Sequence, residues 1–243
     1  MRADPSKYPR LAKYGVGSYP VAYAALTLFG KLVFNTRTEI KVEGQVPVGS
    51  HIIACKHESS VDAPLEHYEL SDSKPQKLAR HDFFDVWYKN LFFTRSESVP
   101  VDRTGEDVQL NIEAANYAAD RLVEGKPALT FPEKHRHQGH IGHIYTDGLR
   151  MLDLLARRRG IRVPVVAASH HYEDGRSSIK DVLNPLAPKP HIRIVYSKPR
   201  YIRDFLTPEA IEEWLAEEYI AALGFEYIND EYNKCIGNLI TTC

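Results

Sequence analysis

Short apolar runs alternate along the chain with longer segments in which apolar residues recur every three or four positions. The short runs predict strands at residues 39–43, 51–55, 77–80, 97–101, 127–131, 161–168 and 191–196. The longer segments predict helices at residues 82–90, 106–124, 145–159 and 208–223, and a further one that starts at Asp62. Strands that alternate with helices are typical of an α/β fold. We therefore expect a mostly parallel central sheet covered by helices on both faces.

An apolar-rich segment at residues 19–34 precedes the first predicted strand and predicts an amphipathic N-terminal helix. It is shorter than the ~20 residues that span a bilayer, and it contains Lys31. Basic residues and tyrosines on its flanks fit a helix that lies in a membrane interface, and a helix packed on the domain is the alternative. We therefore divide the chain into residues 1–37, the helical segment, and residues 38–243, a single domain.

Charge and cysteine content exclude several classes of protein. The net charge of −1 at pH 7 argues against a nucleic-acid partner, because such proteins concentrate lysine and arginine. The cysteines, Cys55, Cys235 and Cys243, are too few and too scattered for a disulfide framework or a cysteine-based zinc site, and they fit a reducing compartment. The N-terminus shows no apolar core of a secretory signal peptide.

A histidine stands five positions before an aspartate where a predicted strand gives way to a predicted helix. A neutral imidazole can take a proton from a hydroxyl near pH 7, and a carboxylate on its other nitrogen fixes the tautomer. His57 and Asp62 are therefore candidates for a general base and its partner. The alternative is a chance spacing, since the chain has eleven histidines. Asp62 is also a favoured residue to cap the helix that follows.

Three further blocks follow this pair in order, each at the end of a predicted strand. They read Val-Pro-Val-Asp-Arg at residues 99–103, Phe-Pro-Glu-Lys-His-Arg at 131–136 and Val-Pro-Val-Val at 163–166. Together with His57 and Asp62 they resemble the glycerolipid acyltransferase family, in particular its lysophosphatidic-acid acyltransferase group. The resemblance spans residues 40–170, which is most of the chain.

The resemblance implies transfer of a fatty acyl group from a thioester to the hydroxyl of a lysophospholipid or glycerol-phosphate acceptor, such as 1-acylglycerol-3-phosphate. The donor would be acyl-CoA or acyl carrier protein, with no other cofactor and no metal. It makes His57 the general base and Asp62 its partner, assigns Arg103 and Arg136 to the acceptor phosphate, and gives Glu133 the role of positioning the acceptor. It also implies a peripheral protein on the cytoplasmic face of a membrane, in contact with the membrane surface.

Chemistry supports the arginine assignment, because a planar guanidinium matches phosphate oxygens with two parallel hydrogen bonds. We expect Asp102 to orient Arg103, and the alternative for either arginine is an ordinary surface ion pair. The carbonyl oxygen of the donor needs hydrogen-bond donors as it becomes an oxyanion. Backbone N–H groups near the start of the helix at Asp62 are the expected source.

The third block departs from the family pattern, which has Gly-Thr where this chain has Lys134 and His135. Because two bulky cations replace a glycine and a threonine, we expect the turn to change shape. The lysine that the family often has near the next helix is replaced by Thr146, and we assign Lys134 to acceptor binding in its place. Ala167 stands where the fourth block of the family has its second proline.

Other features leave alternatives open. Histidines at 135, 137, 140 and 143 could hold zinc, but without helical spacing or a carboxylate motif we favour a basic loop that contacts phosphate. The aromatic-rich residues 87–93 either line a tunnel for the acyl chain or pack in the core. A non-catalytic lipid- or carrier-binding protein on the same fold is the alternative function, and a metal-dependent hydrolase built on the histidines is a third.

Overall fold

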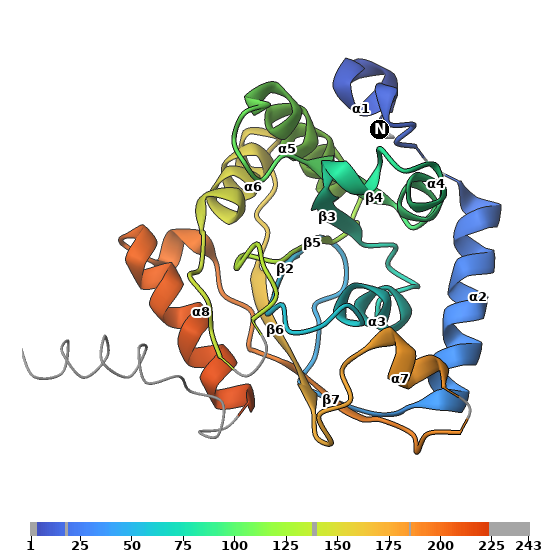
Figure 1. The fold of residues 1–243 in the computed structure, drawn as a ribbon. Coiled ribbons are helices and arrows are strands. Elements are labelled where there is room, and N and C mark those ends of the chain that lie inside the picture. Colours follow the sequence, from blue (N-terminus) through green and yellow to red (C-terminus); the bar gives the residue numbers. More distant parts are fainter. Residues whose placement is uncertain (1–3, 18, 138–139, 185, 224–243) are drawn as a thin grey trace, which may run out of the picture.

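Seven strands form a single sheet at the centre of the computed structural model, which describes residues 4–17, 19–137, 140–184 and 186–223 (Figure 1). Their order is β1-β7-β6-β2-β5-β3-β4. Neighbouring strands are parallel except β6 and β7, which are antiparallel. The bounds are β1 (Glu39–Glu43), β2 (Ile52–Cys55), β3 (Gln76–Arg80), β4 (Ser98–Val101), β5 (Ala128–Thr130), β6 (Val165–Tyr172) and β7 (His191–Tyr196). The expected mostly parallel sheet is confirmed.

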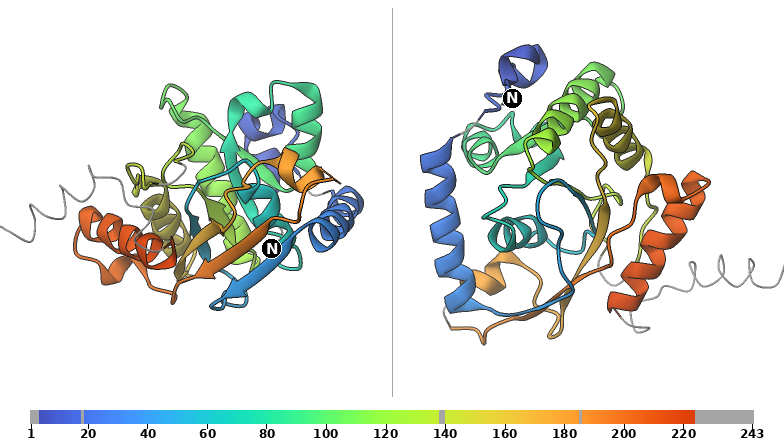
Figure 2. Two further views of the ribbon diagram at one scale, coloured as in Figure 1. Left: turned by 60° about the horizontal axis from the view of Figure 1, so that its bottom comes forward. Right: turned by 180° about the vertical axis from the view of Figure 1, so that it is seen from behind.

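Helices cover both faces of this sheet, as the alternating pattern predicted (Figure 2). In the described ranges the α-helices are α1 (Pro9–Lys13), α2 (Pro20–Arg37), α3 (Asp62–Glu69), α4 (Trp87–Arg95), α5 (Val108–Val123), α6 (Asp147–Arg158), α7 (Ile179–Leu183) and α8 (Pro208–Leu223). Short 3-10 turns are η1 (Pro5–Lys7), η2 (His81–Phe83) and η3 (Ile202–Asp204). Helices α5, α6 and α8 pack on one face, and α2, α3 and α7 pack on the other.

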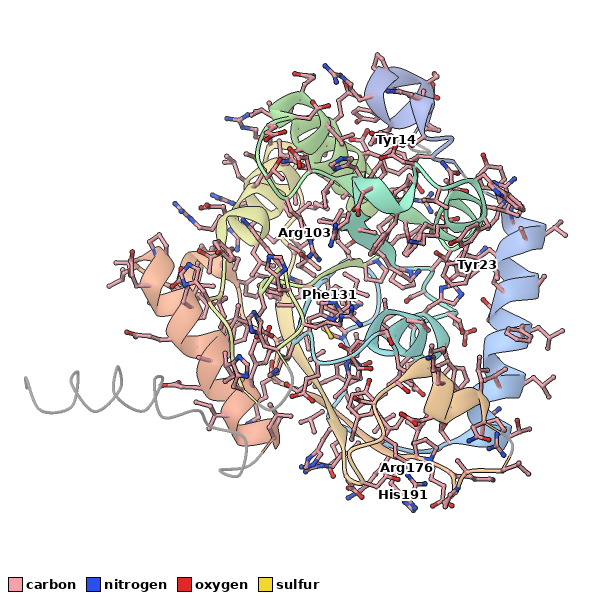
Figure 3. All side chains as sticks on the ribbon, in the orientation of Figure 1. Tyr14, Tyr23, Arg103, Phe131, Arg176 and His191 are labelled. Carbon is pink, nitrogen blue, oxygen red and sulfur yellow. The ribbon has the colours of Figure 1, made fainter. Side chains whose placement is uncertain are left out.

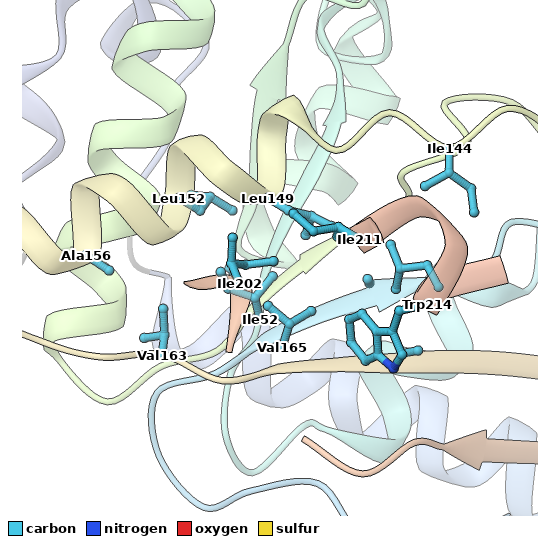
Figure 4. Packing of buried hydrophobic residues seen from close by; sticks show 14 of the residues in the cluster. Ile52, Ile144, Leu149, Leu152, Ala156, Val163, Val165, Ile202, Ile211 and Trp214 are labelled. Atoms are coloured by element: carbon cyan, nitrogen blue, oxygen red, sulfur yellow. The ribbon is translucent and has the colours of Figure 1, made fainter. Parts of the chain in front are cut away.

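Strand β2 shows why both faces need a cover. Successive side chains of a strand point to opposite faces, so Ile52 and Ala54 join the cluster beneath α5, α6 and α8. Ile53 and Cys55 join the cluster beneath α2, α3 and α7. All four side chains are fully buried, which explains the unbroken apolar run in the sequence. Figure 4 shows the first cluster, in which Ile52 packs among side chains of α6 and α8.

Strand β6 is longer at its end than predicted. It continues to Tyr172, four residues beyond the predicted end at 168, because its last residues pair with the antiparallel strand β7. Ser169 and His170 are buried in this extension. Polar residues normally indicate the end of a strand, so the sequence pattern alone placed the boundary too early.

Helix α4 also differs from its prediction. The helix expected over 82–90 begins at Trp87 and ends at Arg95, after the turn η2. Its four exposed large apolar side chains are those of Trp87, Tyr88, Leu91 and Phe92. Of the two alternatives left open for residues 87–93, packing in the core is wrong for these four side chains, because they are exposed. The short helices α1 and α7 were not predicted, because five residues are too few to show a helical period.

Helix α2 has two different faces. Tyr23 and Phe34 are buried, and the ring of Tyr23 meets that of His67 on α3 with 4.8 Å between centroids. Its opposite face exposes four large apolar side chains, those of Val21, Leu28, Phe29 and Leu32. Among the residues that the structure describes, no helix combines the length and the apolarity needed to cross a bilayer. The helix is therefore packed on the domain through one face while an apolar face stays open.

Candidate active site

The carboxyl ends of three adjacent strands bring the predicted catalytic residues together. Strand β2 lies between β5 and β6 and is parallel to both. His57 follows β2, Glu133 follows β5, and β6 ends at Tyr172. Because parallel strands end at the same edge of a sheet, these side chains meet there. Figure 3 labels Phe131 on the segment after β5 and Arg103 on the segment after β4, at this same edge.

Asp62 holds the imidazole ring of His57. His57 Nδ1 donates a hydrogen bond of 2.9 Å to Asp62 Oδ2, which leaves Nε2 as the lone-pair nitrogen of the neutral ring. The ring also packs on Phe131 with 4.4 Å between centroids. The His57 side chain is 17% exposed, whereas that of Asp62 is completely buried. Nε2 is therefore the nitrogen that remains for a substrate hydroxyl.

The Asp62 carboxylate turns back toward the loop that precedes its helix. Oδ2 also accepts hydrogen bonds from the backbone N–H groups of Glu58 (2.8 Å) and Ser59 (2.7 Å). The expectation that Asp62 caps α3 is wrong, because Val61 holds the capping position and its side chain makes no capping bond. The Val61 N–H donates to Ser59 Oγ. These three N–H groups are thus occupied, and the oxyanion donors remain a prediction for the first turn of α3.

Asp62 is ionised although it is fully buried. Burial alone raises the pKa of this carboxyl, but the hydrogen bond from His57, the charge of His170 and the hydrogen bond from Tyr172 outweigh it and hold the pKa below its usual range. The Tyr172 hydroxyl donates to Asp62 Oδ1 at 2.6 Å. A carboxylate with this many donors can stabilise an imidazolium on His57 as the proton arrives.

Glu133 lies behind His57, buried in the protein. Its Oε1 accepts from the His57 N–H at 3.0 Å, and its Oε2 accepts from the Gly142 N–H at 2.7 Å. A further hydrogen bond of 2.8 Å runs from the His137 N–H to the His57 carbonyl, so the segment after Glu133 is also bound to the His57 backbone. Glu133 therefore positions the backbone that carries the base. The role that the family resemblance gave it, acceptor positioning, stays a prediction.

Lys56 is a buried cation that the sequence reasoning missed. Its Nζ donates to the His137 carbonyl at 2.8 Å and lies 3.2 Å from Glu58 Oε1 and 3.9 Å from Glu133 Oε1. The Lys56 side chain is fully buried, so its charge is balanced by these two carboxylates rather than by water. The only signal in the sequence was a lysine directly after a buried strand and directly before the candidate base.

The two predicted phosphate-binding arginines have different surroundings. Arg136 is exposed, while Arg103 is half-buried after β4. Burial and the charge of Arg80 lower the pKa of Arg103, and Asp82 opposes that shift. Arg80 is itself held by Asp82 through two hydrogen bonds of 2.8 and 2.6 Å. Arg103 thus lies in a locally positive region.

Asp102 does not orient Arg103. Its carboxylate accepts from the backbone N–H groups of Asp107 (2.7 Å) and Thr104 (2.9 Å), and no ion pair joins it to Arg103 in the described part of the chain. These hydrogen bonds, that of Asp107 first, lower the pKa of Asp102 to about 2. The expectation was wrong because the tight loop before α5 needs this carboxylate to satisfy its backbone.

Lys134 occupies a turn of the type that favours glycine. Its φ is 60°, in the left-handed region, so the lysine has not removed the glycine-type conformation at this position. The Lys134 N–H donates to the Phe131 carbonyl at 3.0 Å. Its Nζ lies 3.8 Å from the centre of the Tyr145 ring, a cation–π contact. His135, beside it, is exposed.

A model of the acyltransferase family matches residues 39–171, more than half of the chain. The chain belongs to the acyltransferase family. The matched range starts with β1, ends one residue before the end of β6 and contains every predicted site residue.

The fold of this acyltransferase is similar to that of a solved bacterial enzyme. The crystal structure of PlsC, the 1-acyl-sn-glycerophosphate (LPA) acyltransferase of Thermotoga maritima, superposes with a TM-score of 0.56. The match covers 80% of this chain and 75% of that chain, at 18% sequence identity. At this identity the likeness is one of fold. No curated protein matches the acyltransferase in sequence.

The acyltransferase has a second buried cluster beside Asp62 that sequence reasoning did not find. His170 Nδ1 lies 3.5 Å from Asp62 Oδ1, and His170 Nε2 lies 2.9 Å from Glu66 Oε1. Glu66 Oε2 accepts from the Tyr196 hydroxyl at 3.0 Å. Two signals were available: Glu66 follows Asp62 by one helical turn, and His170 follows a buried strand.

The histidine-rich segment at 135–143 does not form a group of metal ligands among the described residues. His137 Nδ1 and His140 Nε2 lie 3.1 Å apart, and the described residues hold no group of three metal ligands that includes this pair. In the part of the chain that the structure describes, a group of three such side chains, with ligand atoms all within 4.8 Å of one another, lies elsewhere and consists of Cys55, Glu66 and His170. Cys55 is buried with a free thiol, while Cys235 and Cys243 lie outside the described residues.

Proposed function

We propose that this acyltransferase moves a fatty acyl group from a thioester, acyl-CoA or acyl carrier protein, to the hydroxyl of a glycerol-phosphate-type lipid such as 1-acylglycerol-3-phosphate. The observation that carries the proposal is the fixed tautomer of His57, whose Nδ1 is bound to a buried carboxylate. A neutral nitrogen at the edge of the site suits removal of a proton from an alcohol. The acyltransferase family and the PlsC-like fold support it.

In the proposed reaction His57 Nε2 takes the proton of the acceptor hydroxyl as its oxygen attacks the thioester carbonyl. The tetrahedral intermediate collapses, the carbon–sulfur bond breaks, and the thiolate leaves. The proton on His57 is then returned to the thiolate, so the products are an ester and a free thiol. Asp62 stabilises the imidazolium that forms between these steps. General-base assistance of this kind contributes about 10²–10⁴-fold to the rate.

The acceptor phosphate is proposed to bind to Arg103 and Arg136, with Lys134 as a further cation. Arg103 supports this role through its place at the carboxyl edge of the sheet, near Arg80. Arg136 and the Lys134 turn belong to the loop that Glu133 ties to His57. A phosphate at these cations would bring a glycerol hydroxyl toward the base.

Exposed apolar side chains support a peripheral association with a lipid surface, where a lipid acceptor would be found. We define the apolar patch as Val21, Leu28, Phe29 and Leu32 of α2 with Trp87, Tyr88, Leu91 and Phe92 of α4. The two helices contact each other (Figure 1). Large exposed apolar areas mark interaction sites, and tryptophan and tyrosine suit the boundary between headgroups and acyl chains.

An acceptor screen tests the proposed function. The protein would be incubated with labelled acyl-CoA and glycerol phosphate, lysophosphatidic acid, other lysophospholipids, glycosylated lipids or monoacylglycerol, with thiol release followed and products identified by mass spectrometry. We expect thiol release only with phosphate-bearing acceptors. Binding of lipid or carrier without thiol release, for every acceptor, would favour the non-catalytic alternative. Equal transfer to monoacylglycerol would contradict the proposed phosphate site.

A further inference from the structure

Behind Asp62, on the side away from His57, lies a histidine held between two carboxylates. His170 Nδ1 faces Asp62 Oδ1 at 3.5 Å, and its Nε2 faces Glu66 Oε1 at 2.9 Å. All three side chains are fully buried. Asp62 thus has one histidine on each of its oxygens, with His57 on Oδ2 and His170 on Oδ1.

Two carboxylates, one beside each ring nitrogen, favour a proton on both nitrogens of His170 over a neutral ring, although Cys55 Sγ also lies 3.6 Å from Nδ1. A neutral imidazole carries one N–H and one lone pair, so it would turn its lone pair toward one of the two carboxylates. Within the described residues, Glu66 Oε1 and His170 Nε2 make no hydrogen bond of good geometry, and the 2.9 Å distance between them is that of an ion pair. Burial alone lowers the pKa of His170, but Glu66, Asp62 and Glu58 outweigh it and raise the pKa above its usual value.

The surroundings of His170 are negative. Asp62 and Glu66 lie one helical turn apart on α3, and two buried carboxylates this close need a compensating charge. Several titratable groups face His170 or interact with its charge. They belong to β2, the loop after β2, α3, β6 and β7. These groups are Cys55, Glu58, Asp62, Glu66, Glu69, Tyr172 and Tyr196. The buried cation nearby, Lys56, is paired with Glu58 and Glu133, so the imidazolium of His170 is the positive charge beside Asp62 and Glu66.

We propose that His170 is a positioning residue of the acyl-transfer site, a buried cation that keeps Asp62 in its carboxylate form and offsets part of its charge. This assignment rests on the proposed function, because it concerns the same base. With the offset, Asp62 orients His57 while stabilising the protonated form of the ring less than an uncompensated carboxylate pair would. Without it, Asp62 and Glu66 would leave two uncompensated negative charges behind the base.

The sign of the effect follows from the charges. In His170→Gln the cluster of Asp62, Glu66 and residue 170 changes from one net negative charge to two, which stabilises the protonated form of His57. The pKa of His57 should therefore rise by about one unit, the scale of a charge interaction over 4–6 Å. Because the base acts when neutral, the acid limb of the kcat/KM profile should move to higher pH by the same amount.

A double variant separates this charge effect from simple packing. Glu66→Gln combined with His170→Gln restores the net charge of the cluster to one negative, and glutamine still accepts from the Tyr196 hydroxyl. We expect the pKa of His57 to return toward the wild-type value in this double variant. Glu66→Gln alone should move the pKa of His57 in the opposite direction, downward, which keeps the proposal testable if His170→Gln does not fold.

The decisive measurement is the pH titration of the His57 ring by NMR of histidine-labelled full-length protein, with circular dichroism to establish folding. A higher pKa in His170→Gln that reverts in the double variant supports the proposal. An unchanged His57 titration in folded His170→Gln overturns it, and so does stoichiometric zinc bound through His170, since a metal-bound ring cannot hold both protons. The titration needs no substrate, so failure of the acyl-transfer assay would contradict the proposed function without affecting this result.

Discussion

The two ring nitrogens of His57 lie in different environments, and this difference is the basis of its proposed role. Nδ1 is bound to a carboxylate that is itself held by two backbone N–H groups and by Tyr172, so ring rotation would break a connected network. Nε2 is not bound to this carboxylate, and the His57 side chain as a whole is 17% exposed. The His57 N–H donates to Glu133 and the His57 carbonyl accepts from the His137 N–H, and both bonds limit motion of the base.

Arg103 provides a residue-level prediction. Arg103→Ala should raise the acceptor KM about 10-fold or more with kcat retained at saturating acceptor, because a charge-assisted hydrogen bond contributes about 1.5–3 kcal/mol to ground-state binding. Initial rates at varied acceptor concentration measure this. Arg203→Ala, at an exposed arginine of η3, is the matched control and should change neither constant. A loss of kcat with unchanged KM would contradict the phosphate assignment.

Sequence reasoning found the residues whose partners are near in sequence and missed those whose partners are far. His57 and Asp62 are five positions apart, so their pairing was predictable from spacing. Glu66 and His170 are joined only because β6 runs beside β2 and extends past the predicted end. A partner more than a hundred residues away leaves no local pattern in a single sequence.

At the level of elements, the predicted strands were found because burial on both faces makes them continuous apolar runs. The predicted ends of the elements were wrong where tertiary contacts determine where an element begins or ends. Strand β6 is extended by pairing with β7, and α4 begins five residues late because the turn η2 takes up the first part of the predicted helix. The antiparallel direction of β7 also had no signal in its own sequence.

The apolar patch on α2 and α4 provides an element-level prediction. Leu28→Ser, Phe29→Ser and Leu32→Ser together should reduce co-flotation with liposomes about 10-fold or more, since three exposed side chains each lose about 1 kcal/mol or more of apolar burial in the interface. Val48→Ser with Leu206→Ser, two exposed positions outside the patch, is the control. Equal flotation of the patch variant and wild type would contradict the membrane role.

A second element-level prediction concerns Gly44, which directly follows β1, and the close packing of the chain there against β7. Its φ is 83°, and a Cβ there would lie 2.2 Å from the Tyr196 carbonyl oxygen. Gly49 has a similar φ of 88° with no atom within 4 Å, so Gly49→Ala carries the left-handed strain alone, about 1 kcal/mol. Gly44→Ala should lower the free energy of unfolding by about 1–3 kcal/mol more than Gly49→Ala, because it adds overpacking. Urea unfolding of both variants measures this, and equal values would contradict the close contact.

At the scale of the whole molecule, the order of the strands makes the site. Strands β6, β2 and β5 are neighbours in the sheet although they are the sixth, second and fifth in the sequence. Their carboxyl ends therefore collect His57, Glu133 and Tyr172 at one edge, while β3 and β4 place Arg80 and Arg103 farther along the same edge. The α/β class was predictable from alternation, but this strand order was not, because pairing between distant strands has no local signature.

The most direct test of the central claim, that His57 is the base of an acyl transfer, compares His57→Ala with His191→Ala. His191 is a half-exposed histidine at the start of β7 and serves as the control. Thiol release from acyl-CoA in the presence of lysophosphatidic acid would be measured, with circular dichroism to establish that each variant is folded. We predict a loss of at least about 10²-fold in His57→Ala and near wild-type activity in His191→Ala. Near-normal turnover by folded His57→Ala would contradict the account.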